Sequence, residues 1–235
     1  MPIERRIEVN GKSRRSNQGF LAPIESWALD RLAAHMPAWV TPNCLTALGF
    51  VGAAIVFVGY GLVMFHSALL WMATTGLAIN WLGDSVDGTL ARYRGIERPR
   101  FGFYLDNSID VLEQLLIVLG LALSGIFKPD LALLCLIVFL MMSILTLIRE
   151  KVVGEFKLAY GGIGLTELRV MLAIINAMVY FFPPLPFNVL TISTSYPNIL
   201  AMAWITGTLI AFVVSMVQDL RILAVEDPPP PPQAQ

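Results

Sequence analysis

Six long apolar segments constrain the fold of this chain more than any other feature. They cover approximately residues 44–65, 67–90, 103–124, 129–148, 166–186 and 196–218. A helix needs roughly 20 apolar residues to cross the hydrocarbon core of a bilayer, and each segment is about that long. Because 56% of the 235 residues are hydrophobic, an ordinary soluble domain is excluded. The sequence therefore predicts an all-α integral membrane protein with six transmembrane helices.

Lysine and arginine residues fall almost entirely on one side of this predicted topology. If both termini lie on the same side, Lys128 is the exception among 16 basic residues. Basic residues gather in the cytoplasmic loops of membrane proteins. We therefore expect a multi-pass protein with both termini, and the loops after the second and fourth segments, in the cytoplasm. The formal net charge of −1 gives no indication of a nucleic acid partner.

The same pattern divides the chain into three regions. We expect residues 1–42 to form a cytoplasmic N-terminal segment and residues 43–220 to form the transmembrane catalytic domain. Because residues 1–18 are polar, we expect no signal peptide there. Residues 221–235 form a proline-rich tail that we expect to be unstructured in the cytoplasm. Within the first region, residues 20–39 mix aromatic and aliphatic residues with charged ones. This mixture favours a short amphipathic helix in the membrane interface over a plain linker.

Four aspartates flank the predicted cytoplasmic loop between the second and third segments. They are Asp84, Asp87, Asp106 and Asp110. Their i,i+3 and i,i+4 spacings place each pair on one face of a helix, and a helical hairpin would bring the two pairs together. Carboxylates in membrane segments are costly and usually functional. Helix capping or pairing with arginine explains one such residue better than it explains four.

The residue types around these carboxylates indicate metal-assisted phosphate chemistry. Carboxylates without nearby histidine or cysteine favour hard cations such as Mg²⁺, Mn²⁺ or Ca²⁺. Two such ions would neutralise the aspartates and bind a diphosphate. The small residues Gly88 and Ala91 leave room beside the carboxylates, and Arg92 suits a phosphate oxygen. We interpret Asp110 as a general base for an attacking hydroxyl.

The aspartates belong to two runs of sequence, Asp84-Ser-Val-Asp87-Gly88-Thr-Leu-Ala91-Arg92 and Gly102-Phe-Tyr-Leu-Asp106-Asn-Ser-Ile-Asp110. Together these runs resemble the signature of the CDP-alcohol phosphotransferase family. Members of that family are six-span membrane enzymes, usually homodimers, that act in phospholipid biosynthesis. They move a substituted phosphate from a CDP-alcohol to a hydroxyl acceptor and release CMP. The spacer from Tyr93 to Phe101 is one residue longer than the usual family spacer.

The resemblance implies a role for each residue of the motif. The residues that would bind two divalent cations, Mg²⁺ or Mn²⁺, are Asp84, Asp87, Asp106 and Asp110. The residues that would line the CDP site are Gly88, Ala91, Arg92, Gly102 and, from a stretch that resembles the family's entry to its first span, Thr46. Asp110 would also serve as the general base.

The acceptor site is indicated less directly. Arg149 and Arg169 lie near the cytoplasmic ends of the fourth and fifth segments. They would suit the phosphate of an acceptor such as glycerol 3-phosphate or inositol phosphate, and they equally obey the charge asymmetry of membrane proteins. Glu113, one turn beyond Asp110, has two interpretations, contact with the acceptor or pairing with an arginine.

Several functions remain open at this point. We favour CDP-diacylglycerol as donor with a small polar acceptor over transfer from CDP-choline or CDP-ethanolamine to a lipid hydroxyl. A divalent-cation transporter is an alternative from another class, but its carboxylates are expected near the bilayer midplane on broken helices. An intramembrane prenyltransferase would also bind a metal-diphosphate through aspartates, but without the glycine, alanine and arginine found here.

Overall fold

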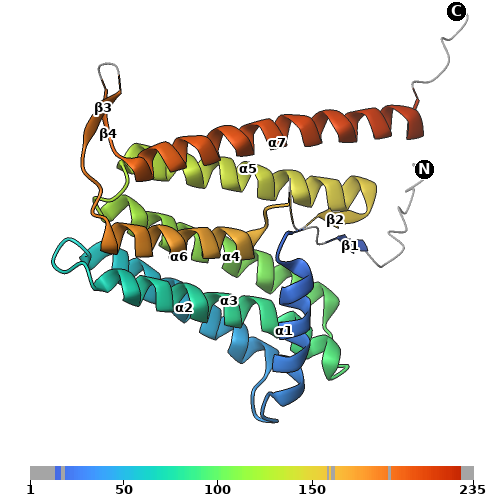
Figure 1. Ribbon diagram of the computed structural model, residues 1–235. Coiled ribbons are helices and arrows are strands. Elements are labelled where there is room, and N and C mark those ends of the chain that lie inside the picture. Colours follow the sequence, from blue (N-terminus) through green and yellow to red (C-terminus); the bar gives the residue numbers. More distant parts are fainter. Residues whose placement is uncertain (1–13, 17–18, 158, 160–161, 190–191, 229–235) are drawn as a thin grey trace, which may run out of the picture.

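The protein is a bundle of long helices (Figure 1). The computed structural model describes residues 14–16, 19–157, 159, 162–189 and 192–228. Its helices are α1 (Ala22–His35), α2 (Pro42–Leu62), α3 (Leu69–Tyr93), α4 (Pro99–Leu123), α5 (Pro129–Val153), α6 (Leu165–Phe181) and α7 (Tyr196–Glu226). Each of the six apolar segments coincides with one of the helices α2 to α7, so the all-α prediction is confirmed for the described residues.

Two pairs of very short strands accompany the helices. Strand β1 (Arg14–Ser16) pairs in parallel with β2 (Glu155–Lys157), which lies between α5 and α6. Strand β3 (Phe187–Val189) pairs antiparallel with β4 (Ile192–Thr194), between α6 and α7. Figure 1 places the two pairs at opposite ends of the bundle. The β1–β2 pair therefore ties the N-terminal segment to the connection between α5 and α6.

Within the described residues, three helices are long and apolar enough to cross a membrane, namely α2, α5 and α7. Helices α3 and α4 carry the aspartates of the motif, and α6 is shorter, with 17 residues. Polar side chains lower the mean hydropathy of a helix even where it lies among other membrane helices. The composition therefore supports three spans directly.

Prolines and small residues determine where the helices begin and end. Pro42, Pro99 and Pro129 each occupy the first position of a helix, where a missing N–H costs nothing. The hydroxyl of Thr41 accepts a hydrogen bond from the Cys44 N–H at 3.3 Å and so caps α2. Helix α5 ends at Gly154, whose φ of 76° lies in the left-handed region that favours glycine.

Helices α2 and α3 pack with their backbones in contact. A Cβ atom on Gly59 would lie 2.8 Å from the Ala73 nitrogen, and one on Gly76 would lie 2.8 Å from the Val56 nitrogen. Atoms added to Gly52 or Gly83 would lie closer still to the opposite backbone. Small residues at a helix interface permit this close approach in membranes. The interface holds α3, which carries Asp84 and Asp87, firmly against α2.

We expect Gly83→Ala to destabilise the protein by about 1–3 kcal/mol, because the new methyl group would force α2 and α3 apart. Thermal unfolding in detergent measures this effect. Gly61→Ala is a matched control on α2, because a Cβ there would meet nothing within 4 Å. An equal response of the two variants would contradict the close packing of the helices.

The remaining helices form two walls. Helix α6 packs on α3, whereas α5 packs on α4 and α7 packs on α5. In Figure 1, α5 and α7 run side by side along one edge of the bundle. Helix α6 therefore packs against α3, whereas α5 and α7 pack on the side of α4. A cavity lies between α6 and the pair formed by α5 and α7.

Helix α1 crosses one end of the bundle (Figure 1). A small apolar cluster holds it on α3, with Ala33 on α1 and Val86 and Leu90 on α3 at its centre. On its outer side Ile24 and Trp27 are 68% and 60% exposed. A helix is thus present within residues 20–39, with apolar side chains directed both toward α3 and away from it.

Arg94 ties α1 to the end of α3. Its guanidinium donates to the carbonyl oxygens of Met36, Pro37 and Val40 at 3.1, 2.8 and 2.5 Å. These carbonyls belong to the connection between α1 and α2. The contacts therefore hold that connection against the end of α3.

The two predicted terminal regions are described only in part. Helix α7 continues to Glu226, past the start of the tail predicted from residue 221, because residues 221–226 contain good helix formers and no proline or glycine. The prolines begin at Pro228, and residues 229–235 lie outside the described residues. Residues 1–13 also lie outside them.

Candidate active site

Three of the four predicted aspartates come together at one end of the bundle. Asp84 lies on α3, and Asp106 and Asp110 lie on α4. One carboxylate oxygen from each lies within 4.8 Å of the others, and all three side chains are half-buried. The short connection between α3 and α4 turns the chain back on itself, so the spacing rules of each helix bring the two pairs to the same depth.

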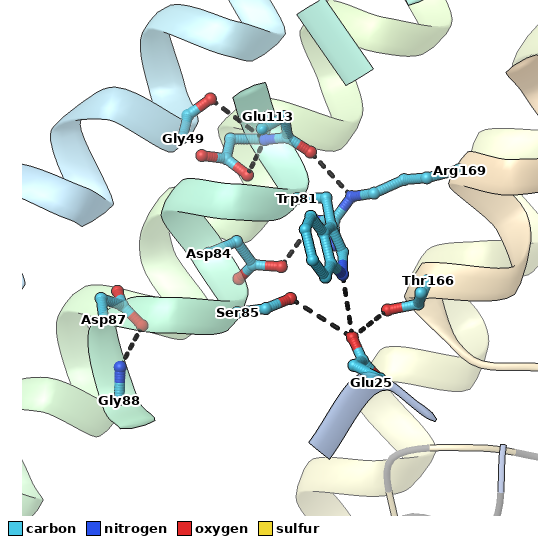
Figure 2. Close-up of polar contacts among 11 residues, drawn as sticks. Glu25, Gly49, Trp81, Asp84, Ser85, Asp87, Gly88, Glu113, Thr166 and Arg169 are labelled. Carbon is cyan, nitrogen blue, oxygen red and sulfur yellow. Dashed lines mark hydrogen bonds and ion pairs between the residues drawn. The ribbon is translucent and has the colours of Figure 1, made fainter. Parts of the chain in front are cut away.

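Asp87 has separate contacts. Its Oδ2 accepts a hydrogen bond from the Thr46 hydroxyl at 2.6 Å, and its Oδ1 accepts one from the Gly88 N–H at 2.5 Å. Figure 2 shows its carboxylate directed toward Gly88. Thr46, predicted to contact the nucleotide, is thus placed beside Asp87. Both residues still line the cavity that contains the other aspartates.

Arg169 forms a buried ion pair with this cluster. Its Nη2 donates to Asp84 Oδ2 at 2.6 Å, and its Nε donates to the side-chain oxygen of Asn80 at 2.8 Å. The residue is 6% exposed. A buried charge needs such partners, because an unpaired one is costly. Of the two arginines predicted for the acceptor, Arg169 is therefore the one beside the carboxylates.

Asn80 connects this ion pair to the rest of the bundle. Its Nδ2 donates to Glu113 Oε2 at 2.7 Å and to the Gly49 carbonyl at 3.1 Å. Asn80 is fully buried and Glu113 is 2% exposed. Glu113 thus contacts Asn80, which in turn contacts Arg169. The network joins α2, α3, α4 and α6, and Asn80 was not predicted from the sequence.

Glu25 of α1 is the centre of a second group of hydrogen bonds, between α1, α3 and α6. Its Oε1 accepts hydrogen bonds from Trp81 Nε1 at 3.0 Å and Ser85 Oγ at 3.5 Å, and it also accepts one from the Thr166 hydroxyl. Figure 2 shows these three donors converging on the carboxylate. The sequence indicated only that Glu25 belongs to an amphipathic segment, so its role as a contact between helices was missed.

The residues predicted to surround the nucleotide all line the same cavity. They are Gly88, Ala91, Arg92 and Gly102. A Cβ on Gly102 would meet no atom within 4 Å, and one on Gly88 would meet only Arg92 Nη1, at 3.4 Å. Packing within the protein does not require these glycines to be small. They instead leave open space beside the carboxylates.

Arg149 lies elsewhere. It forms an ion pair with Asp219 of α7, and it is not among the residues that line the cavity. The contact joins the ends of α5 and α7. The structure therefore does not bring Arg149 together with Arg169.

The cavity extends far beyond the acidic cluster. Its volume is about 2470 Å³, and it lies between α4, α5, α6 and α7. Along α4 its lining runs from Gly102 to Leu121, which is about 28 Å at 1.5 Å per residue. Away from the aspartates the lining is mostly apolar and includes Phe139, Met178 and Trp204. One continuous space thus joins a charged end to a long apolar groove.

The donor set of the acidic cluster fits a hard divalent cation. Asp84, Asp106 and Asp110 offer only oxygen ligands, which Mg²⁺ and Mn²⁺ prefer. Like charges at this separation repel one another unless a cation or proton neutralises them. Arg169 supplies one positive charge to this group. The geometry supports a metal-binding site without identifying the metal.

Residues 39–214 match the sequence model of the CDP-alcohol phosphatidyltransferase family. The chain belongs to this family. The matched region contains all the site residues predicted from the motif, and it leaves α1, with Glu25, outside.

The chain is also similar to individual named proteins. The chain is 34% identical to an archaetidylinositol phosphate synthase of Pyrococcus horikoshii over 122 residues, 52% of this chain and 61% of the relative. It is 28% identical to a phosphatidylinositol phosphate synthase of Mycolicibacterium smegmatis over 160 residues, 66% of this chain and 70% of the relative. A 66-residue stretch, 27% of this chain, is 35% identical to a fluoride-specific ion channel of Corynebacterium diphtheriae, of which it covers 70%.

Proposed function

We propose that this CDP-alcohol phosphatidyltransferase moves a phosphatidyl group from CDP-diacylglycerol to a hydroxyl group of an inositol phosphate and releases CMP. The observation that carries the proposal is the single cavity that follows α4 over about 28 Å and joins the acidic cluster to an apolar groove. A lipid donor has this same division into a charged diphosphate and long acyl chains. The names of the two synthases among the relatives support the acceptor.

The four aspartates would hold two divalent cations, Mg²⁺ or Mn²⁺. Asp84, Asp106 and Asp110 already converge, and Asp87 lies one turn from Asp84 on the same helix. When bound, such cations neutralise the charge of a diphosphate and make CMP a better leaving group. Gly88, Ala91, Arg92 and Gly102 would then form the wall against which the CDP moiety lies.

Asp110 would act as the general base. In the transfer step, the acceptor hydroxyl oxygen bonds to the phosphorus of the phosphatidyl group while the bond from that phosphorus to the oxygen of CMP breaks. The hydroxyl proton passes to the carboxylate of Asp110. The ionised form of a carboxylate has the free lone pair that this requires.

Arg169 would orient the acceptor through its phosphate. Arg169 is among the residues that line the cavity, its guanidinium pairs with Asp84, and Asn80 fixes the direction of that group. Planar guanidinium groups bind phosphate oxygens with defined geometry. Because Arg149 is engaged with Asp219, we assign the acceptor phosphate to Arg169 rather than to Arg149.

The membrane arrangement completes the proposal. Helices α2 to α7 would provide six spans within a transmembrane domain of residues 43–220, and α1 would lie in the interface with Ile24 and Trp27 toward the lipid. The end of α7, α1 and β1 lie at one end of the bundle (Figure 1), and Glu25 of α1 contacts Ser85 next to Asp84. This arrangement supports a cytoplasmic active site. The enzyme would act as a homodimer.

The test is CMP release by purified protein in detergent or liposomes. We expect release with CDP-diacylglycerol and inositol phosphate together, loss of release with EDTA, and recovery with added Mg²⁺ or Mn²⁺. Release with CDP-diacylglycerol and glycerol 3-phosphate, but not with inositol phosphate, would contradict the proposed acceptor. Release only from CDP-choline or CDP-ethanolamine with a lipid hydroxyl would overturn the choice of donor.

Ion transport is the alternative from another class. The short resemblance to a fluoride channel favours testing it, although a cluster of carboxylates repels anions. Flux of fluoride or divalent cations through liposomes, without CMP release from any donor, would contradict the proposed transfer.

A further inference from the structure

The N-terminal segment is attached at several points to the connection that leads into α6. Strand β1 pairs with β2, and the Phe20 N–H donates to the Gly162 carbonyl at 3.0 Å. The Leu21 N–H donates to Glu167 Oε1 at 2.8 Å. The other oxygen of Glu167 accepts the Gly164 N–H at 2.8 Å. The start of α6 is therefore held from the outside by a segment far away in the sequence.

Glu25 extends this attachment to the active site. One oxygen of its carboxylate joins three helices, because Trp81 and Ser85 lie on α3 and Thr166 lies on α6 (Figure 2). The side chain of Glu25 is half-buried. Its three donors are an indole and two hydroxyl groups, so its hydrogen bonds involve no positive charge.

The partners of Glu25 surround the ion pair between Asp84 and Arg169. Ser85 follows Asp84 directly, and Thr166 lies one helical turn before Arg169. Glu25 therefore sets the separation of α3 and α6 at the depth where that ion pair forms. Arginine has a long side chain, so the position of its guanidinium depends on the helix backbone that carries it. A displacement of about 1 Å in a site can reduce activity by about 10²-fold.

We propose that Glu25 is a positioning residue that holds the first turn of α6, and with it Arg169, for binding the acceptor phosphate. This inference rests on the proposed function, because it uses the assignment of Arg169 to the acceptor. It also gives α1, which lies outside the region matched by the family, a part in the reaction. In the proposed function the CDP moiety of the donor would lie against Gly88, Ala91, Arg92 and Gly102, which Glu25 does not contact, so donor binding should be little affected.

The test compares Glu25 variants of the full-length protein in CMP release. We expect Glu25→Ala to raise the KM for inositol phosphate by about 10-fold or more, with the KM for CDP-diacylglycerol unchanged. Glu25→Gln should recover most of the affinity, because an amide oxygen accepts the same hydrogen bonds. Glu226→Gln is the matched control, because Glu226 is exposed at the end of α7.

A second variant identifies the contact that matters. Thr166→Val should also raise the acceptor KM. Its effect should not add to that of Glu25→Ala, because both substitutions remove the same hydrogen bond between Thr166 and Glu25. Additive effects, or equal increases of the donor and acceptor KM, would overturn the positioning role. Thr166→Val also keeps the test informative if Glu25→Ala fails to fold.

The two proposals fail in different ways. If the wild-type protein releases no CMP with any acceptor, the proposed function is overturned and the positioning role with it. If the wild-type protein is active and Glu25→Ala retains the wild-type acceptor KM, the positioning role alone is overturned.

Discussion

Replacement of Asp110 by asparagine is expected to lower kcat for CMP release by about 10²–10⁴-fold, the range that general-base catalysis contributes. Asparagine keeps the size and most of the shape of the side chain, but it cannot take up the proton of the acceptor hydroxyl. The loss should therefore appear in kcat, with thermal unfolding close to that of the wild-type protein. Steady-state CMP release and an unfolding curve on the same sample measure both quantities.

Asp130→Asn is the control for this variant. Asp130 is exposed in the first turn of α5, at the other end of that helix from the acidic cluster, so its replacement should leave CMP release unchanged. If Asp110→Asn retained activity within about tenfold of the wild type, Asp110 would not be the base. Asp87, which lines the same cavity, would then be the next candidate.

The aspartate cluster shows what local rules predict well. The spacing of Asp106 and Asp110 determines a helix face without any knowledge of the remaining chain. The short connection between α3 and α4 then leaves few ways to arrange the two helices, and Asp84 joins the cluster as expected. Asp87 differs because its contacts with Thr46 depend on how closely α2 approaches α3.

The partners of the two arginines predicted for the acceptor site could not be predicted from the sequence. Arg149 and Arg169 look alike in the sequence, since both are basic residues near the ends of apolar segments. Packing separates them, because Arg169 faces α3 and Asp84 while Arg149 faces α7 and Asp219. No rule of spacing predicts which helix an arginine will meet when the partner lies 70 or 85 residues away.

The apolar groove and the contact of Glu25 are also products of tertiary structure. Apolar residues such as Phe139 and Trp204 are of the same types as residues that face lipid. The sequence therefore cannot distinguish a cavity wall from the outer surface of the bundle. Glu25 and Thr166 are 141 residues apart. Their contact forms only because α1 crosses the bundle and β1 pairs with β2.

The buried amide of Asn80 is expected to be the polar group on which stability depends most. Asn80→Leu would leave the Gly49 carbonyl, Glu113 and the Nε of Arg169 without their present partner. Each buried polar group left unsatisfied costs about 1–3 kcal/mol, so we expect a loss of about 3 kcal/mol or more. Thermal unfolding in detergent measures the loss, and Asn188→Leu, at an exposed asparagine of β3, is the control.

A double variant separates stability from positioning at this site. Adding Glu113→Leu to Asn80→Leu removes the buried carboxylate that lost its donor, and removing both partners costs less than removing one. The double variant should therefore be more stable than Asn80→Leu alone. Its acceptor KM should still be raised, because Arg169 keeps Asp84 but has lost the contact that directs its Nε. A double variant that regained both stability and acceptor affinity would show that Asn80 supports the fold without orienting Arg169.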